Sequence, residues 1–242
     1  MNVSESFHTL GIETSCDETA VAILRNETEV LANLVYSQAD VHARFGGVVP
    51  EIASRNHLGK LPYLVRQALT EARLEAKDLS LVGATYGPGL VGPLLVGVSH
   101  GKGLAYGLSV PFLGVNHLEG HIFADRLTAS PSEPPFMALV VSGGHTSLID
   151  VEAYARYRTI GTTVDDAAGE ALDKIGKMIG LGYPAGAEID RLAREGDPTA
   201  IRFPRPMATS AGFDFSFAGL KTSVLYYLKK HPHERPRDIA AS

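Results

Sequence analysis

Residues 8–25, HTLGIETSCDETAVAILR, contain two apolar stretches on either side of a short polar turn. Their length and β-branched content predict two strands, residues 8–13 and 19–25, joined by residues 14–18. Residues 136–151, FMALVVSGGHTSLIDV, repeat this order, with Gly143-Gly144 at the turn. Two copies of strand, polar turn and strand predict two related α/β lobes with a cleft between them.

The elements expected around these two hairpins follow a similar order in each half of the chain. After the first hairpin, apolar periodicity predicts strands at 30–36, 81–86 and 110–115, with helices at 50–73 and 94–108. After the second, it predicts a strand at 158–160 and helices at 164–179, 187–194 and 218–228. The Pro- and Ser-rich residues 130–135 separate the halves. We therefore expect an N-terminal lobe at 1–129 and a C-terminal lobe at 136–242.

Composition limits the class of protein. The chain has 242 residues, of which 45% are hydrophobic and 20% charged, values ordinary for a soluble globular protein. A net charge of −5 does not favour a generic nucleic-acid coat. A single cysteine, Cys16, favours a reducing cytoplasm, and a start (residues 1–6) without basic or apolar character predicts no signal peptide. The most apolar long stretch, residues 90–108, is broken by Pro93, Ser99, His100 and Lys102, so no membrane segment is expected.

His117-Leu118-Glu119-Gly120-His121 is the stretch that most strongly indicates chemistry. On a helix, residues four apart share a face, so both imidazoles can reach one metal ion. Glu119 lies roughly opposite them, which argues against the zinc-protease arrangement, in which the glutamate directly follows the first histidine. The alternative is that the two histidines share a solvated or core face by chance.

Several other motifs are candidates for ligand binding. The turns at residues 14–19 and 142–146 could cradle an anion with backbone N–H groups. Gly87–Gly92 has no Gly-Lys-Ser/Thr and is interpreted as a strand-to-helix turn. Asp165 and Asp166 are expected to cap the helix at 164–179. Asp166, Glu170 and Asp173 share a face of that helix and could bind ribose or a cation, or be solvated.

Seven motifs, taken together and in this order, resemble those of the TsaD family of bacterial tRNA N6-adenosine threonylcarbamoyltransferases, once called O-sialoglycoprotein endopeptidases. The motifs are GIETSCDET (11–19), GGVVPEIASR (46–55), GPGL (87–90), HLEGH (117–121), VSGGHT (141–146), DDAAGE (165–170) and FDFSFAGLK (213–221). The resemblance covers nearly the whole chain.

The resemblance implies an α/β, actin-like (ASKHA) two-lobed fold with duplicated mixed β-sheets flanked by helices. It implies transfer of a threonylcarbamoyl group from threonylcarbamoyl-AMP to the N6 amine of the adenosine adjacent to the tRNA anticodon. His117 and His121 would bind one divalent metal ion, iron or zinc, and Glu13 would be a catalytic or cation-side carboxylate. The residues implied to bind the adenylate are Val140, Val141, Ser142, Gly143, Gly144, Asp173, Gly186 and Asp190.

The resemblance also implies partners and a longer chain. The partners would be tRNA, an inert paralogue (TsaB) and a small ATPase (TsaE). The family's chain continues about a hundred residues further, so the second lobe is expected to be incomplete here, with a third metal ligand in the missing C-terminal tail. The basic residues considered for RNA contact are Lys221, Lys229, Lys230, Arg235, Arg237, Arg202 and Arg205, which could equally be a solvated face. Alternatives are an ATPase or small-molecule kinase on the same fold, a nucleotide-binding scaffold, or a truncated inactive form.

Overall fold

The computed structural model describes residues 6–242, which divide into two compact units between Pro131 and Ser132. The first five residues, on which part of the expectation of no signal peptide rests, lie outside the described residues. Within residues 6–242, no helix is both long enough and apolar enough to cross a bilayer.

The first unit is built on a five-stranded mixed sheet of order β3-β2-β1-β4-β5. The first three strands form an antiparallel meander, and β4 and β5 lie parallel to β1. The strands are β1 His8–Glu13, β2 Glu18–Arg25, β3 Glu29–Ser37, β4 Leu81–Gly87 and β5 Phe112–Asn116. The hairpin predicted from residues 8–25 is therefore confirmed as β1 and β2.

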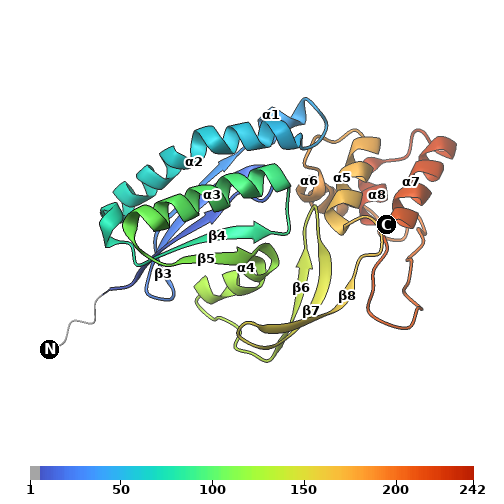
Figure 1. Ribbon diagram of the computed structural model, residues 1–242. Coiled ribbons are helices and arrows are strands. Elements are labelled where there is room, and N and C mark those ends of the chain that lie inside the picture. Colours follow the sequence, from blue (N-terminus) through green and yellow to red (C-terminus); the bar gives the residue numbers. More distant parts are fainter. Residues whose placement is uncertain (1–5) are drawn as a thin grey trace. The chain divides into compact units, whose positions relative to one another are not determined.

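Helices α2 (Pro50–Ala72) and α3 (Val91–Leu108) pack together over one face of this sheet (Figure 1). The main core lies between them and the strands, where Leu10, Ile23 and Leu61 are fully buried. The glycines of α3 allow close packing against the sheet: a side chain on Gly101 would come within 3.0 Å of the Phe112 ring. The other helical segments are α1 Ala39–Ala43, α4 His117–Phe123, and the 3₁₀ turns η1 Ala76–Asp78 and η2 Ala124–Leu127.

The buried stripe of α2 is not the one that apolar residues alone would form. Leu58 is 67% exposed, whereas His57 is fully buried. The stripe instead follows Ala53, His57, Leu61, Leu64 and Ala68. A histidine can take a core position when both ring nitrogens have hydrogen-bond partners, and a count of apolar residues cannot show such partners.

The second unit contains an antiparallel sheet of order β6-β7-β8 followed by helices. The strands are β6 Phe136–Val141, β7 Thr146–Ala153 and β8 Arg156–Thr162, which repeat the β1-β2-β3 meander. The helices are α5 Ala168–Met178, α6 Gly186–Ala193, α7 Ala218–Lys230 and α8 Pro236–Ala241. They pack on one another (Figure 1) around a second core that includes Ile175, Ala185 and Val224.

The start of α5 differs from the sequence prediction by four residues, because Asp165 caps a different helix. Its Oδ1 accepts hydrogen bonds from the N–H groups of Phe217 and Ala218, where α7 begins. Residues 163–166 therefore form a loop, and Ala167 is the N-cap of α5. The expectation that Asp165 and Asp166 cap the helix that follows them was wrong.

Candidate functional site

His117 and His121 lie one turn apart at the start of α4. The side chain of Asn116 accepts a hydrogen bond from the N–H of Leu118 at 2.8 Å and caps the helix directly after β5. In this helical geometry the two Nε2 atoms are 3.1 Å apart, and the rings meet edge to face. The sequence prediction that both imidazoles point to one place is thus met by their geometry.

Glu13, at the end of β1, contacts His117 from the neighbouring part of the sheet. Its carboxylate accepts hydrogen bonds from Thr85 Oγ1 at 2.6 Å and from the N–H of Ser15, and its Oε2 lies 3.1 Å from His117 Nδ1. Burial by itself would raise the pKa of Glu13, but the hydrogen bonds from His117, Ser15 and Thr85 outweigh it and lower the pKa to about 2. Glu13 is therefore ionised at neutral pH.

An ionised Glu13 decides which nitrogen of His117 carries a proton. A carboxylate can only accept a hydrogen bond, so Nδ1 of His117 carries the proton and donates a hydrogen bond to Glu13. The lone pair of His117 Nε2 then faces His121. Burial, followed by the neighbouring His117, lowers the pKa of His121, which keeps its ring neutral at physiological pH. With Nδ1 donating to Glu13, Nε2 is the nitrogen of His117 that can ligate a metal ion.

The donor set fits two adjacent positions in the coordination sphere of a metal ion. Imidazole nitrogens lie about 2.0–2.1 Å from a bound zinc, which places neighbouring ligands about 3.0–3.4 Å apart. The observed 3.1 Å between the two Nε2 atoms falls in this range. A carboxylate on the far nitrogen of a ligating histidine is also a recurrent feature of metal sites. Within residues 6–242, no cluster of three or more His, Cys, Asp or Glu residues suited to a metal occurs.

The polar turn between β1 and β2 uses its own hydroxyls internally. Thr14 Oγ1 donates to the carbonyl of Pro93 at 2.8 Å, and Ser15 Oγ lies 3.3 Å from His117 Nδ1. The carbonyl of Ser15 accepts from the N–H of Leu90, so the Gly87–Gly92 segment is a strand-to-helix turn held against it. The hydroxyls of Thr14 and Ser15 therefore already have partners within the protein.

The same turn rests on a buried histidine that the sequence did not reveal. His57 Nε2 donates to the carbonyl of Cys16 at 2.8 Å, and its Nδ1 accepts from Thr19 Oγ1 at 2.8 Å. Gln38 and His42 extend this fully buried polar cluster through a 3.2 Å contact between Gln38 Oε1 and His42 Nε2. The cluster fixes the backbone that follows Glu13, and only the spacing of polar residues along α2 could have indicated it.

Cys16 sits at the tip of the turn, and its thiol is held in the protonated state. Desolvation and the neighbouring Asp17 raise the pKa of Cys16 to about 12. Because the thiolate is the nucleophilic form of cysteine, this shift argues against a nucleophilic role for Cys16.

In the second unit, the predicted adenylate residues Val140–Gly144 form the end of β6 and the turn into β7. Ser142 Oγ accepts from the N–H of His145 at 3.0 Å and closes the turn. No atom lies within 4 Å of the positions that side chains would occupy on Gly143 and Gly144. A ligand can therefore approach the backbone of this turn closely, whereas Val140 is buried and Val141 is exposed.

The other predicted adenylate residues lie on α5 and α6. Asp173 Oδ1 accepts from the N–H of Ala185 at 2.7 Å, directly before Gly186 begins α6. Asp190, one turn later, is exposed and pairs with Arg194 at 2.6 Å. Asp166 and Glu170, which could have bound a ribose or a cation, both pair with Lys174 instead.

The second unit also contains a cavity of about 480 Å³ lined by aromatic and apolar side chains. The lining includes Phe203, Phe213, Phe215 and Leu148, together with Arg205. None of the predicted adenylate residues lines this cavity, so it is distinct from the turn at Ser142–Gly144.

Comparisons with known proteins give a consistent result. The family model for TsaD, tRNA N6-adenosine threonylcarbamoyltransferase, matches residues 29–242. A relative of that name from Geotalea daltonii is 56% identical over 92% of this chain and 65% of its own length. One from Thermosipho melanesiensis is 51% identical over 96% of this chain and 71% of its own length. The chain thus spans about two thirds of the length of these relatives.

The structural comparison supports the fold alone. Component A of (R)-2-hydroxyglutaryl-CoA dehydratase from Acidaminococcus fermentans aligns with 97% of this chain and 72% of its own, with a TM-score of 0.53 and 15% identity. The α/β, actin-like fold expected from the sequence is confirmed. With the family match over most of its length, the chain belongs to the TsaD family of tRNA N6-adenosine threonylcarbamoyltransferases.

Proposed function

We propose that this chain takes part in transferring a threonylcarbamoyl group from threonylcarbamoyl-AMP to the N6 amine of the adenosine adjacent to the tRNA anticodon. In this reaction the N6 nitrogen attacks the carbamoyl carbonyl carbon, the bond from that carbon to the phosphate oxygen breaks, AMP leaves, and the amine loses a proton. The observation that carries the proposal is the convergence of His117 and His121 beside Glu13, in a chain of this family.

His117 and His121 would hold one divalent metal ion, iron or zinc, through their Nε2 atoms. When bound, such an ion supplies Lewis acidity to a carbonyl or phosphate oxygen. Glu13 would orient His117 by accepting a hydrogen bond from its Nδ1–H. A carboxylate with three hydrogen-bond donors and a pKa of about 2 is a weak base, so no proton is transferred to it. A third ligand is proposed from the part of the relatives' length that this chain does not span.

The donor would bind on the second unit. The open backbone of Gly143 and Gly144 suits the close approach of a phosphate or ribose, with Val140, Val141 and Ser142 shaping the turn. Asp190, although paired with Arg194, is exposed and could accept hydrogen bonds from hydroxyl groups. Asp173 would act by fixing the start of α6, where Gly186 permits access. In this proposal the metal site belongs to the N-terminal lobe, residues 1–129, and the donor site to the C-terminal lobe, residues 136–242.

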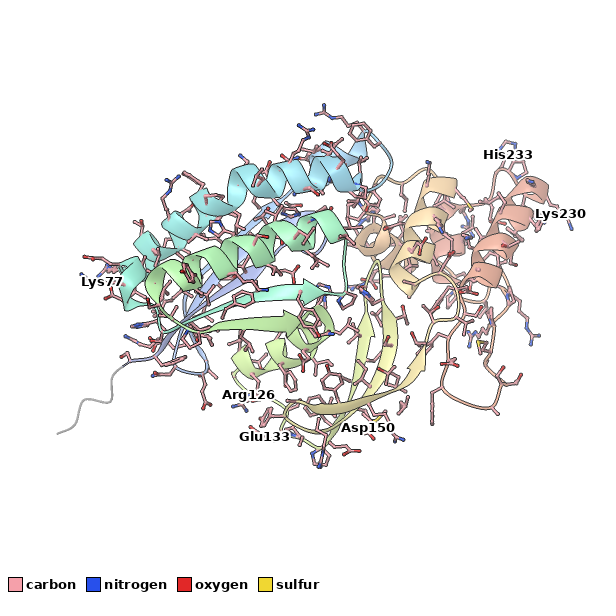
Figure 2. The ribbon with its side chains drawn as sticks, viewed as in Figure 1. Lys77, Arg126, Glu133, Asp150, Lys230 and His233 are labelled. Atoms are coloured by element: carbon pink, nitrogen blue, oxygen red, sulfur yellow. The ribbon has the colours of Figure 1, made fainter. Side chains whose placement is uncertain are left out.

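The contact with tRNA would involve fewer basic residues than the sequence suggested. Lys221 is paired with Asp166, and Arg235 is paired with Asp238. Lys229 and Lys230 lie in the last turn of α7, and Figure 2 shows Lys230 and His233 projecting outward there. We propose that Lys229, Lys230 and Arg237 contact RNA phosphates. An inert paralogue and a small ATPase would be the protein partners.

The transfer is tested by incubating the 242-residue chain with threonylcarbamoyl-AMP, a tRNA transcript and both proposed partner proteins, and then analysing the nucleosides by mass spectrometry. Modified adenosine should form, and His117→Ala and His121→Ala should each reduce its rate about a hundredfold or more. His100→Gln, a histidine on α3 that is none of the proposed metal, donor or RNA-contact residues, is the matched control and should leave the rate unchanged. Wild-type rates in both metal-site variants would contradict the role of the histidine pair.

The same reaction separates the proposal from its alternatives. ADP release by the 242-residue chain alone, supplied with ATP but with neither tRNA nor the partner proteins, would indicate an ATPase or a small-molecule kinase. Binding of AMP with no product in the presence of all partners would indicate a scaffold or an inactive form. RNA binding is tested separately by titrating tRNA at several salt concentrations: Lys229→Ala and Lys230→Ala should each lower the salt slope by about 1. Lys77→Ala, on the first unit, serves as the control.

A further inference from the structure

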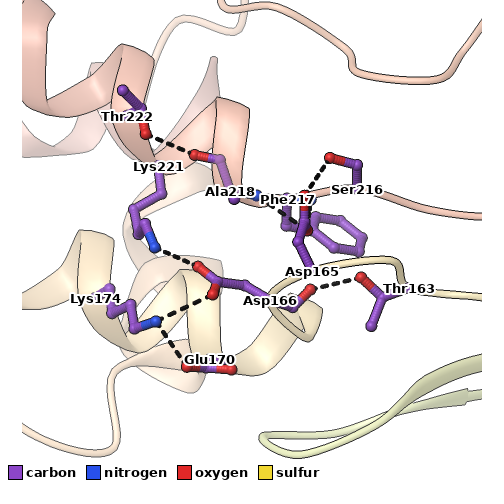
Figure 3. Close-up of polar contacts among 10 residues, drawn as sticks. All are labelled: Thr163, Asp165, Asp166, Glu170, Lys174, Ser216, Phe217, Ala218, Lys221 and Thr222. Carbon is purple, nitrogen blue, oxygen red and sulfur yellow. Dashed lines mark hydrogen bonds and ion pairs between the residues drawn. The ribbon is translucent and has the colours of Figure 1, made fainter.

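Asp166 lies between two lysines that come from different helices (Figure 3). Its Oδ1 is 3.1 Å from Lys174 Nζ on α5, and its Oδ2 is 2.5 Å from Lys221 Nζ on α7. Only 16% of the Asp166 side chain is exposed. With Glu170, which also pairs with Lys174, the cluster contains two acids and two bases and is electrically balanced.

The residue before it ties the same loop to the start of α7. Asp165 accepts from Ser216 Oγ at 2.6 Å and from the N–H of Phe217 at 2.8 Å. The backbone of residues 162–164 also pairs with Phe215. The loop 163–166 is thus fixed to the start of α7 by side chains and backbone together (Figure 3).

Immediately after this loop, the first turn of α5 rests on the turn proposed to bind the donor. The N–H of Gly169 donates to the carbonyl of Ser142 at 3.1 Å, and the N–H of Ala168 donates to Thr146 Oγ1 at 2.9 Å. A side chain on Gly169 would lie 2.6 Å from the Ser142 oxygen and 2.8 Å from the Gly143 nitrogen. The backbone of α5 therefore touches the Ser142-Gly143 peptide directly.

Helix α5 also fixes the remaining donor residues. Through Asp173 it holds the N–H of Ala185 and hence the start of α6, with Gly186 and Asp190. A side chain on Gly176 would meet the Cβ of Ala185 at 2.2 Å, so the two helices are in close contact there. The position of α5 therefore determines the positions of both parts of the proposed donor site in this unit.

We infer that Asp166 and Lys221 are positioning residues, which hold α5 against α7 and thereby set the Ser142–Gly144 turn for the adenylate. The role of the turn in binding the adenylate rests on the proposed function. Lys174 differs in kind from Lys221, because it lies on α5 only eight residues after Asp166 and its pair with Asp166 stays within one segment of the chain, whereas Lys221 reaches Asp166 from α7.

This difference gives a matched pair of variants in the 242-residue chain. Lys221→Met and Lys174→Met each remove one cation from the same carboxylate. Amide hydrogen exchange followed by mass spectrometry should show about five- to tenfold faster exchange in peptides covering residues 142–146 and 168–170 for Lys221→Met, and for Asp166→Asn. Lys174→Met should stay within about twofold of the wild type. Equal effects of the two lysine variants, or no effect, would overturn the inference.

Binding of AMP, measured by calorimetry, provides the functional readout. The dissociation constant for AMP should rise about five- to tenfold in Lys221→Met and in Asp166→Asn. In Asp166→Glu, which keeps the carboxylate, it should lie closer to the wild-type value. Unchanged AMP affinity in Lys221→Met would overturn the positioning role while leaving the donor site intact. If the wild type does not bind AMP, the proposed donor site fails, and the exchange measurement still decides whether Asp166 and Lys221 hold the turn.

Discussion

The Glu13 carboxylate and the His117 imidazole meet at 3.1 Å although they are 104 residues apart in the chain. Parallel pairing of β1 with β4 and of β4 with β5 brings the ends of these strands to one edge of the sheet, where α4 begins. The fold therefore places the Glu13 carboxylate beside His117 Nδ1. With Nδ1 held there, His117 Nε2 points towards His121 Nε2.

Glu13→Gln should weaken metal binding about 10- to 100-fold, because an amide is a poorer acceptor for the Nδ1 proton and no longer favours one tautomer of His117. The measurement is a titration of zinc or cobalt(II) against a competing chelator. Glu119→Gln is the matched control, since Glu119 lies on the same helix but is not among the partners of Glu13. Equal affinities for the Glu13 variant and the wild type would contradict the orienting role.

Cys16 should react slowly with iodoacetamide even though it is exposed. With a pKa of about 12, the folded chain has about 2,000-fold less thiolate at pH 8 than the urea-unfolded chain, where the pKa is about 8.5. Because a thiolate of higher pKa is the better nucleophile, alkylation should be roughly a hundredfold slower. Mass spectrometry of timed samples gives the rate. Asp17→Asn should accelerate alkylation in the folded chain, because Asp17 contributes to the raised pKa. A folded rate equal to the unfolded one would refute the shift.

Asp166 should make the stability of the chain depend on pH below about pH 5. Lys221 first, and then Lys174, outweigh burial and lower the pKa of Asp166 in the folded state. Because the folded pKa lies below the unfolded value of about 3.9, the stabilisation is complete above that value and is lost as pH falls through the folded pKa. Asp166→Asn should therefore cost about 1–3 kcal/mol of unfolding free energy at pH 7.

The cost of Asp166→Asn should shrink towards zero as the pH is lowered past the folded pKa, when the wild-type carboxyl is itself neutral. Urea unfolding of both proteins at a series of pH values measures this. Asp150→Asn is the control, because Asp150 pairs with Arg158 at 3.5 Å on the surface of the same unit and no comparable dependence is expected. A pH-independent difference for Asp166→Asn would contradict the electrostatic origin.

Local patterns in the sequence were sufficient for the strands and for the histidine pair. The alternation of apolar and polar residues in 8–13 and 19–25 reports a half-buried strand, and the spacing of His117 and His121 is a property of one helical turn. The sequence also predicted that Glu13 ends its strand. It could not predict the hydrogen-bond donors of Glu13, because two of them, Thr85 and His117, are distant in the sequence.

Long-range polar contacts explain what the sequence could not give. Asp165 precedes a helix and looks like its cap, yet it caps α7, about 50 residues away, so α5 begins later than predicted. By residue type His57 is less suited to the core than Leu58. Its partners lie elsewhere in the sequence: the carbonyl of Cys16 is in the β1–β2 turn, and Thr19 is on β2. Neither partner can be identified from the periodicity of α2.

Gly169→Ala should be strongly unfavourable although it places a better helix former inside a helix. The new Cβ would lie 2.6 Å from the Ser142 oxygen and 2.8 Å from the Gly143 nitrogen, and both are backbone atoms that cannot rotate away. The expected loss is about 1–3 kcal/mol of unfolding free energy, with AMP binding weakened because the Ser142–Gly144 turn must shift.

Gly59→Ala in α2 is the matched control, since nothing lies within 4 Å of its Cβ position. There alanine should be neutral or stabilise by about 0.5–1 kcal/mol through helix propensity. The same small effect at both glycines would show that α5 does not press on the turn.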